Sequence, residues 1–147
     1  MIGIIVTGHG TFATGLTSGL KLLAGEPSDY ELVDFDPEES LEVLTENLKR
    51  ALDHLTSCEG VLILADLTGG SPYNTAVRLK LGGRNHIEVI GGVNLPILLD
   101  AYMNRNLISD PEVLSRTSLE AGKTQTICFE ALANETDEED DEIEFDE

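Results

Sequence analysis

The fold is most clearly indicated by the stretch Gly60-Val61-Leu62-Ile63-Leu64-Ala65-Asp66-Leu67-Thr68-Gly69-Gly70-Ser71-Pro72-Tyr73-Asn74, which begins with the most hydrophobic predicted strand of the chain, residues 60–65. Its uncharged aliphatic half predicts a strand that is covered on both faces. The two glycines and the Ser-Pro pair that follow predict a turn and a new helix, with Ser71 as its cap and Pro72 at the first helical position. The stretch therefore indicates a strand, a turn and a helix, which together form the repeating unit of an α/β fold.

The same order of signals recurs along the chain. Strands are predicted at residues 2–6, 32–35, 60–65 and 87–90, and helices at 12–23, from Asp36-Pro37 to Leu55, at 71–81, from Leu95 and from Asp110-Pro111. Helical spacing of apolar residues and the capping signals define the helices, and Glu39 is placed to reach back to the Asp36 cap. Successive strand–helix units predict a three-layer α/β sandwich with a mainly parallel, doubly wound sheet of order 2-1-3-4.

Charge is concentrated at one end of the chain. The formal charge is −19, and ten acidic residues but no basic residue lie from Glu135 onward. This distribution predicts one domain over residues 1–133 and a disordered acidic tail over residues 134–147. The rest of the chain, with 18 acidic and nine basic residues, disfavours nucleic acid and favours a basic protein as the partner.

Three further features bear on the compartment and on cofactors. No apolar run reaches the roughly 20 residues that span a bilayer, and the N-terminus has no signal-peptide pattern. Cys58 and Cys128 are far apart and match no metal-binding spacing. We therefore expect a cytoplasmic protein with buried thiols and no bound metal.

Two strand ends carry the residues that are candidates for chemistry. His9 follows the first strand within Thr7-Gly8-His9-Gly10-Thr11, and Asp66 follows the third. In the order 2-1-3-4 these two strands are neighbours, so both side chains are expected at the same carboxyl edge of the sheet. A carboxylate that accepts a hydrogen bond from one imidazole nitrogen fixes the tautomer and leaves the other nitrogen free to attack. The pair therefore predicts a histidine that carries a phosphoryl group.

The turn after Asp66 provides for an anion. Gly69, Gly70 and Ser71 stand at a helix start, where free backbone N–H groups and the helix dipole favour negative charge. Gly8 and Gly10 allow close approach to the histidine. A single histidine in a turn is more commonly a surface or capping residue, and Gly-Gly-Ser-Pro alone is a common helix start. Their combination at two adjacent strand ends favours a functional site, whereas His54 and His86 lack such a setting and are expected to be structural.

Three motifs together resemble the mannose-family enzyme IIA of the bacterial phosphoenolpyruvate-dependent sugar phosphotransferase system. They are Ile4-Ile5-Val6-Thr7-Gly8-His9-Gly10, the segment from Asp66 to Asn74, and Gly91-Gly92-Val93-Asn94-Leu95-Pro96, and their order and spacing agree over nearly all of residues 1–131. The resemblance implies that His9 accepts the phosphoryl group, that Asp66 orients it and that Ser71 lines the phosphoryl pocket. It further implies binding roles for Gly8, Gly10, Thr11, Thr68, Gly69, Gly70 and Asn94, and it implies no cofactor.

The resemblance also implies partners. The donor would be the phosphocarrier HPr and the acceptor an enzyme IIB, here expected as a separate polypeptide, with the membrane sugar-transport subunits reached indirectly. The family forms a homodimer in which a C-terminal antiparallel strand is exchanged between the two copies. Residues 124–131 match that segment, and their alternation of polar and apolar residues, with Ile127 and Phe129 on one face, independently predicts an edge or added strand.

Two alternatives remain open on sequence alone. One is the related subunit of a dihydroxyacetone kinase, which also takes its phosphoryl group from HPr. The other is a regulatory module that binds a flavin or nucleotide at the switch point of the sheet. The first turn has no Gly-x-Gly-x-x-Gly pattern, which disfavours the second alternative.

Overall fold

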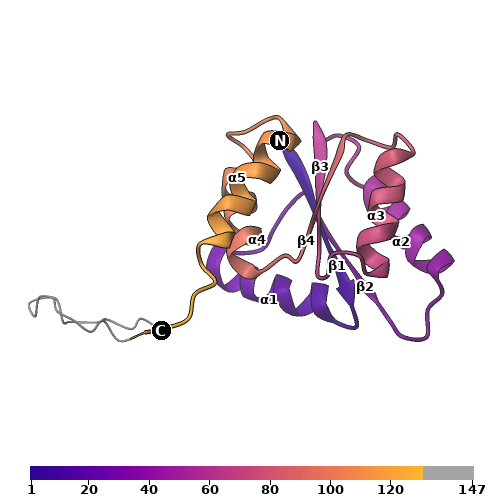
Figure 1. Ribbon diagram of the computed structural model, residues 1–147. Helices are drawn as coiled ribbons and strands as arrows, with labels where there is room; N and C mark the ends of the chain where they lie inside the picture. Colours follow the sequence, from indigo (N-terminus) through magenta and orange to yellow (C-terminus); the bar gives the residue numbers. More distant parts are fainter. Residues whose placement is uncertain (131–147) are drawn as a thin grey trace, which may run out of the picture.

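The computed structural model describes residues 1–130, and in this part of the chain strands and helices alternate from the N-terminus (Figure 1). The elements are β1 (Ile2–His9), α1 (Phe12–Ala24), β2 (Tyr30–Phe35), α2 (Leu41–Asp53), β3 (Gly60–Ala65), α3 (Ser71–Leu81), β4 (Ile87–Gly91), α4 (Leu95–Asn104) and α5 (Pro111–Lys123).

The four strands form one parallel sheet in the order β2-β1-β3-β4. This confirms the predicted order for these strands. β1 lies between β2 and β3, in a register that pairs His9 with Phe35 on one side and Thr7 with Ala65 on the other. The carboxyl ends of three strands therefore meet at one edge of the sheet.

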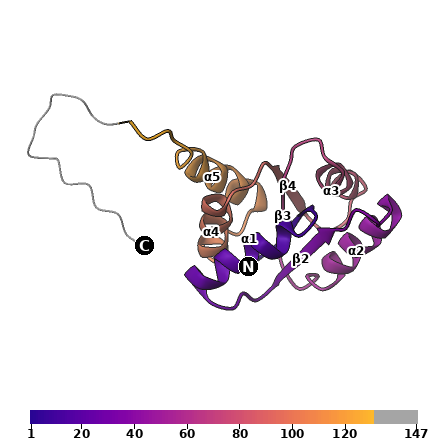
Figure 2. The ribbon, with the colours of Figure 1, turned by 90° about the horizontal axis from the view of Figure 1, so that it is seen from below.

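Helices cover both faces of the sheet, as Figures 1 and 2 show. On one face, Ile4 and Val6 of β1 pack into a core shared with α1, α4 and α5. On the other face, Ile5 packs with the apolar sides of α2 and α3, including Leu48 and Leu52. Every residue of β3 is buried, as the aliphatic sequence predicts for a central strand between two helical layers.

Two predicted boundaries at the site, the end of β1 and the start of α3, are wrong by one to three residues. β1 does not end at Val6 but continues to His9, because β2 pairs with it as far as Phe35. His9 is thus the last residue of a strand and does not lie in a free turn. At α3, Gly70 occupies the cap position and Ser71 is the first helical residue, so Ser71 does not cap the helix.

The predicted start of α2 is also wrong. Glu39 reaches back to Asp36 as predicted, and its carboxylate accepts the backbone N–H of Asp36 at 3.0 Å, but this contact closes a separate turn before the helix. The helix begins at Leu41, where the Ser40 hydroxyl accepts the backbone N–H of Val43 at 3.2 Å. The residues of the turn make their hydrogen bonds with one another, and Ser40 supplies the cap of the helix.

Residues 124–130 form no strand in the described chain. The side chains of Ile127 and Phe129 are 80% and 69% exposed, and this segment leads away from α5 in Figure 1. Cys128 is exposed as well, which corrects the expectation of buried thiols, while Cys58 is partly buried. Ala131, the domain limit at residue 133 and the predicted acidic tail lie outside the described residues.

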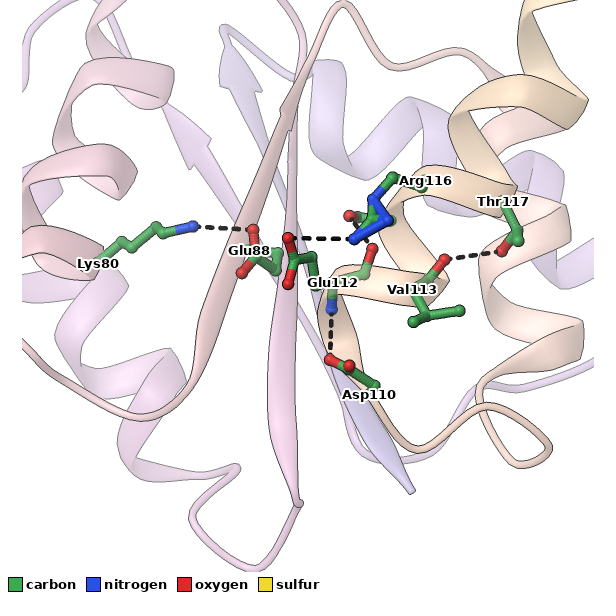
Figure 3. A network of polar contacts seen from close by, with 8 residues as sticks. Lys80, Glu88, Asp110, Glu112, Val113, Arg116 and Thr117 are labelled. Carbon is green, nitrogen blue, oxygen red and sulfur yellow. Dashed lines mark hydrogen bonds and ion pairs between the residues drawn. The ribbon is translucent and has the colours of Figure 1, made fainter.

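Polar contacts tie the edge strand β4 to α3 and cap the start of α5 (Figure 3). Glu88 of β4 accepts a hydrogen bond from Lys80 of α3 at 2.8 Å, which places a charge pair on an edge strand. Asp110 caps α5 by accepting the backbone N–H of Glu112 at 3.0 Å, and Glu112 pairs with Arg116 one turn later at 3.1 Å. No helix within residues 1–130 combines the length and hydrophobicity of a membrane span.

Candidate functional site

His9 and Asp66 lie in direct contact at the carboxyl edge of the sheet. Nδ1 of His9 is 2.9 Å from Oδ2 of Asp66, and the same oxygen accepts the backbone N–H of His9 at 2.8 Å. The contact follows from the neighbouring positions of β1 and β3, since Asp66 is the first residue after β3 and its N–H bonds to the carbonyl of Thr7 at 3.2 Å. The structure thus brings together two groups that are 57 positions apart in the chain.

This contact determines which imidazole nitrogen is available. A carboxylate only accepts hydrogen bonds, so Nδ1 of His9 carries the proton and Nε2 keeps its lone pair. The His9 side chain is 47% exposed, whereas that of Asp66 is 14% exposed. The second oxygen of Asp66, Oδ1, is buried and has no hydrogen-bond partner among the described residues. The pair therefore combines an accessible nucleophile with a mostly buried orienting group.

Two neighbours confine the imidazole ring. The ring of Phe35, at the end of β2, meets it edge-on with 6.1 Å between the ring centroids. On another side the ring lies so close to Gly70 that a Cβ added there would be 2.8 Å from Cε1 of His9. Only a glycine leaves the imidazole in place at this position.

The start of α3 beside this ring is an uncapped helix N-terminus. Side chains cap α2, α4 and α5, but no side chain caps α3. The cap position is occupied by Gly70, which has no side chain and lies against the ring of His9, and the first helical residue is Ser71. Because the first N–H groups of a helix have no partner within it, this end can hold an anion that is attached to His9.

The remaining predicted glycines shape the same edge. A Cβ on Gly8 would be 2.9 Å from Cγ of Asp66 and 2.7 Å from Cδ1 of Phe12, so the carboxylate and the aromatic ring both pack where a side chain would stand. Gly10 and Gly69 adopt positive φ angles of 59° and 88°. They allow the chain to turn directly after His9 and directly before Gly70.

Other predicted binding residues lie nearby in different roles. Thr68 packs against Gly91 at the end of β4, and a Cβ on Gly91 would clash with the Thr68 hydroxyl. Thr11 is the residue before α1 and its side chain makes no capping hydrogen bond. Asn94 caps α4 by accepting the N–H of Ile97 at 2.9 Å and lies 3.5 Å from the Thr126 hydroxyl. Its amide is thereby engaged in holding α4, and the structure does not join it to His9.

Three residues of the site were not foreseen from the sequence. Asn74 donates to the carbonyl of Gly69 at 3.0 Å and so fixes the turn before α3. From β2, Phe35 contacts the ring of His9, and Asp34 contacts Thr14 at the start of α1. The predicted strand order could have indicated Asp34 and Phe35, because it makes β2 a neighbour of β1 and places the carboxyl end of β2 beside His9. The Asn74 contact depends on the turn conformation, for which the sequence carried no comparable signal.

The sheet and the site define a class: a doubly wound α/β protein with a carboxylate-oriented histidine next to a free helix N-terminus. The profile of one family, EIIA-man, described as "PTS system fructose IIA component", matches residues 3–117. The chain belongs to this mannose-type family of phosphotransferase system IIA components.

Relatives of known sequence and structure agree with that assignment. The "PTS system mannose-specific EIIAB component" of Escherichia coli (strain K12) is 36% identical over 122 residues, which cover 83% of this chain and 38% of that protein. The chain therefore spans about two fifths of that relative's length. The "PTS system fructose-specific EIIA component" of Bacillus subtilis (strain 168) is 30% identical, with 96% and 99% of the two chains covered.

A solved structure shows the same fold. The phosphotransferase system component EIIA from Streptococcus agalactiae superimposes with a TM-score of 0.81 at 27% identity, covering 87% of this chain and 97% of that one. These comparisons confirm the family that the sequence motifs indicated. They do not favour the dihydroxyacetone kinase subunit or the flavin- or nucleotide-binding module.

Proposed function

We propose that this protein is a cytoplasmic phosphocarrier that takes a phosphoryl group from phosphorylated HPr onto Nε2 of His9. In this step a P–N bond to Nε2 forms while the P–N bond of the donor breaks. The group then passes to an enzyme IIB and serves sugar uptake through the membrane subunits. The observation that carries the proposal is the Nδ1 contact with Asp66, which leaves Nε2 as the free nitrogen next to Gly70.

The residues around His9 match the needs of phosphoryl transfer. That reaction depends mainly on positioning and on electrostatic stabilisation of the transferred group. Asp66 orients the ring and stabilises the positive charge that develops on it. The N–H groups at the start of α3, together with the Ser71 hydroxyl, receive the negative charge of the phosphoryl group. Thr68, Gly69 and Asn94 are proposed to border the face on which the partners dock.

Labelling tests this function directly. Incubation with phosphoenolpyruvate, enzyme I and HPr should produce an acid-labile adduct on the wild-type protein and none on His9→Ala. His54→Ala is a matched control, because Nδ1 of His54 also faces a carboxylate, Glu31, at 3.3 Å. It should label like the wild type. Equal labelling of His9→Ala and the wild type would refute the proposal.

We also propose that two copies exchange their C-terminal segments, with residues 124–131 adding an antiparallel strand to the partner's sheet. The exposure of Ile127 and Phe129 supports this, since apolar side chains on an alternating segment favour pairing with a sheet edge. An apolar hollow of about 450 Å³ beside Leu95, Leu99 and Met103 offers further surface for a second copy to cover.

The oligomeric state tests the exchange. Light scattering should give the mass of a dimer for the wild type and of a monomer for Ile127→Asp combined with Phe129→Asp, because two buried charges would be unpaired in the interface. Leu81→Asp, a change of an exposed residue at the end of α3, is the control and should remain dimeric. A monomeric wild type would refute the exchange and leave the phosphocarrier proposal untouched.

A further inference from the structure

The connection between His9 and α1 is short, and its last residue does not cap the helix. Only Gly10 and Thr11 separate β1 from α1. Gly10 adopts a positive φ of 59°, and the Thr11 side chain makes no capping hydrogen bond to the helix. A short connection that contains a glycine and ends in an uncapped helix is intrinsically mobile unless other parts of the fold hold it.

Asp34, near the end of β2, holds this helix start from outside. Its Oδ2 accepts the Thr14 hydroxyl at 2.5 Å, and its Oδ1 accepts the Thr14 backbone N–H at 3.1 Å. Thr14 is the third residue of α1, so the carboxylate satisfies one of the free N–H groups of the first turn and lies at the positive end of the helix dipole. Asp34 thus supplies across 20 positions the cap that Thr11 does not provide.

The next residue of β2 holds the other end of the same connection. The carbonyl of Phe35 accepts the backbone N–H of Gly10 at 2.8 Å, and its ring lies edge-on to the imidazole of His9. Adjacent residues of one strand therefore hold the chain on both sides of the Gly10–Thr11 connection. These two contacts are the restraints that the end of β2 places on the connection.

The first residue of α1 transmits this restraint to the reacting pair. The ring of Phe12 packs against Gly8 at the point where the Asp66 carboxyl group approaches the same residue. If the first turn of α1 loosens, Phe12 moves away from Gly8, and the space beside the Asp66 carboxylate opens. The Asp66 carboxylate is then free to shift relative to His9.

We propose that Asp34 is a positioning residue for phosphoryl transfer, which fixes the His9–Asp66 pair by holding the first turn of α1 through Thr14. This inference rests on the proposed function of His9. It assigns to Asp34 an effect on the orientation of the imidazole and no contact with the phosphoryl group.

The test measures two quantities on the full chain: the kinetics of phosphoryl transfer from phosphorylated HPr, and the tautomer of His9 by ¹⁵N NMR. Asp34→Ala should lower kcat by at least about tenfold, because a 1 Å misplacement can cost on the order of a hundredfold. KM for HPr should stay within about twofold of the wild-type value, since Asp34 does not form the docking face. The fraction of His9 protonated on Nδ1 should fall.

Two further variants separate positioning from a loss of folding. Asp34→Asn keeps an acceptor for the Thr14 N–H and should recover part of kcat and of the Nδ1-protonated fraction. Thr14→Val removes the hydrogen bond of the Thr14 hydroxyl but keeps that of its backbone N–H. It should therefore lower kcat and the Nδ1-protonated fraction of His9 by less than Asp34→Ala does. If Asp34→Ala does not fold, Thr14→Val decides whether Asp34 positions His9. Glu31→Gln, on the same strand but facing His54, should match the wild type.

The outcomes distinguish this inference from the proposed function. Wild-type kcat and a wild-type tautomer ratio in folded Asp34→Ala, or in Thr14→Val if Asp34→Ala does not fold, would overturn the role of Asp34 while His9 labelling still stands. If the wild type accepts no phosphoryl group, the proposed function fails, and the NMR arm alone decides whether Asp34 orients His9.

Discussion

At the residue scale, the charge of Asp66 is expected to matter more than its shape. Asp66→Asn keeps the size of the side chain, but its amide group can donate to Nδ1 and so favour the tautomer in which Nε2 carries the proton. A similar exchange next to a catalytic histidine lowers turnover by roughly 10⁴ in serine proteases. We therefore expect the rate of phosphoryl transfer to His9 to fall by about 10² to 10⁴, measured by rapid-quench labelling.

A second carboxylate provides the control for that experiment. Asp53 is exposed and pairs with Arg84, away from His9, so Asp53→Asn should transfer at the wild-type rate. A wild-type rate in Asp66→Asn would show that the carboxylate does not set the tautomer, and the mechanism proposed for His9 would then be wrong.

Gly70 is the residue at which a single methyl group should separate activity from stability. Its φ and ψ of −78° and 171° are accessible to alanine, but the added Cβ would lie 2.8 Å from Cε1 of His9. Gly70→Ala should therefore fold, displace the imidazole and reduce phosphoryl transfer by at least about tenfold. Transfer rates and thermal unfolding of the same sample check both parts.

Gly15 is the matched control. It lies within α1 with nothing near the position of an added Cβ. Gly15→Ala should therefore raise the unfolding free energy by about 0.5–1 kcal/mol and leave transfer unchanged. A fully active Gly70→Ala would show that the close packing against His9 is not needed.

The sequence predicted that His9 and Asp66 would meet, which the structure confirms as a contact, but it did not predict the contacts made by the end of β2. His9 and Asp66 each follow a strong strand signal, so the strand order was enough to bring them together. Asp34 and Phe35 end a more polar strand, and their contacts with Thr14 and Gly10 cross from one element to another. Such contacts depend on the register and on how α1 is placed, which local patterns do not determine.

At the element scale, the start of α2 offers a direct comparison of two candidate caps. Ser40 accepts the N–H of Val43, so Ser40→Ala should lower the unfolding free energy by about 1 kcal/mol. Asp36 accepts the N–H of Glu38 in the separate turn, so Asp36→Ala should cost less. Urea unfolding of the two variants measures the difference, and a larger loss for Asp36→Ala would place the helix start at the turn.

The pair Asp36-Pro37 predicts the helix start, because proline is favoured at the first helical position. The observed cap, Ser40, was not predicted, although serine is also a favoured cap residue. In the observed helix, which starts at Leu41, the side chains of Leu44, Leu48 and Leu52 lie in the core beside β1 and β3. The end of β1, the other boundary that moved, follows from its pairing with β2.

At the scale of the whole molecule, the fold was predictable because hydrophobicity, turn signals and capping signals agreed along nearly the entire chain. Strands with both faces buried require helices on both sides, and parallel neighbours require crossovers, so few arrangements remain. The segment 124–130 is different. Its alternating pattern predicts a strand, but it pairs with no strand within residues 1–130. An alternating pattern shows only that a segment suits a sheet, and it does not specify which strand the segment would pair with.

Tyr30 joins several parts of the molecule and should make global stability depend on alkaline pH. Its hydroxyl bonds to Thr17 of α1 at 2.7 Å, and its ring meets that of Tyr102 of α4. Burial raises the pKa of Tyr30 from 10.0 to about 12, because the phenolate loses its hydration inside the fold. Below pH 10 the folded and unfolded states both keep the phenol proton, and the contribution of Tyr30 to stability is complete.

Between pH 10 and pH 12 the unfolded chain loses that proton while the folded protein keeps it, so the unfolding free energy should fall as the pH rises. The loss is at most about 3 kcal/mol, because one pKa unit corresponds to about 1.4 kcal/mol. Tyr30→Phe should be less stable at neutral pH, since the buried Thr17 hydroxyl loses its partner, but it should lose less stability between pH 10 and pH 12.

Urea unfolding of the wild type and of Tyr30→Phe at several pH values tests the difference. Parallel losses from pH 10 to pH 12 would mean that Tyr30 ionises as readily in the folded protein as in the unfolded chain, and the contact between β2 and α1 would then not exclude water from its hydroxyl.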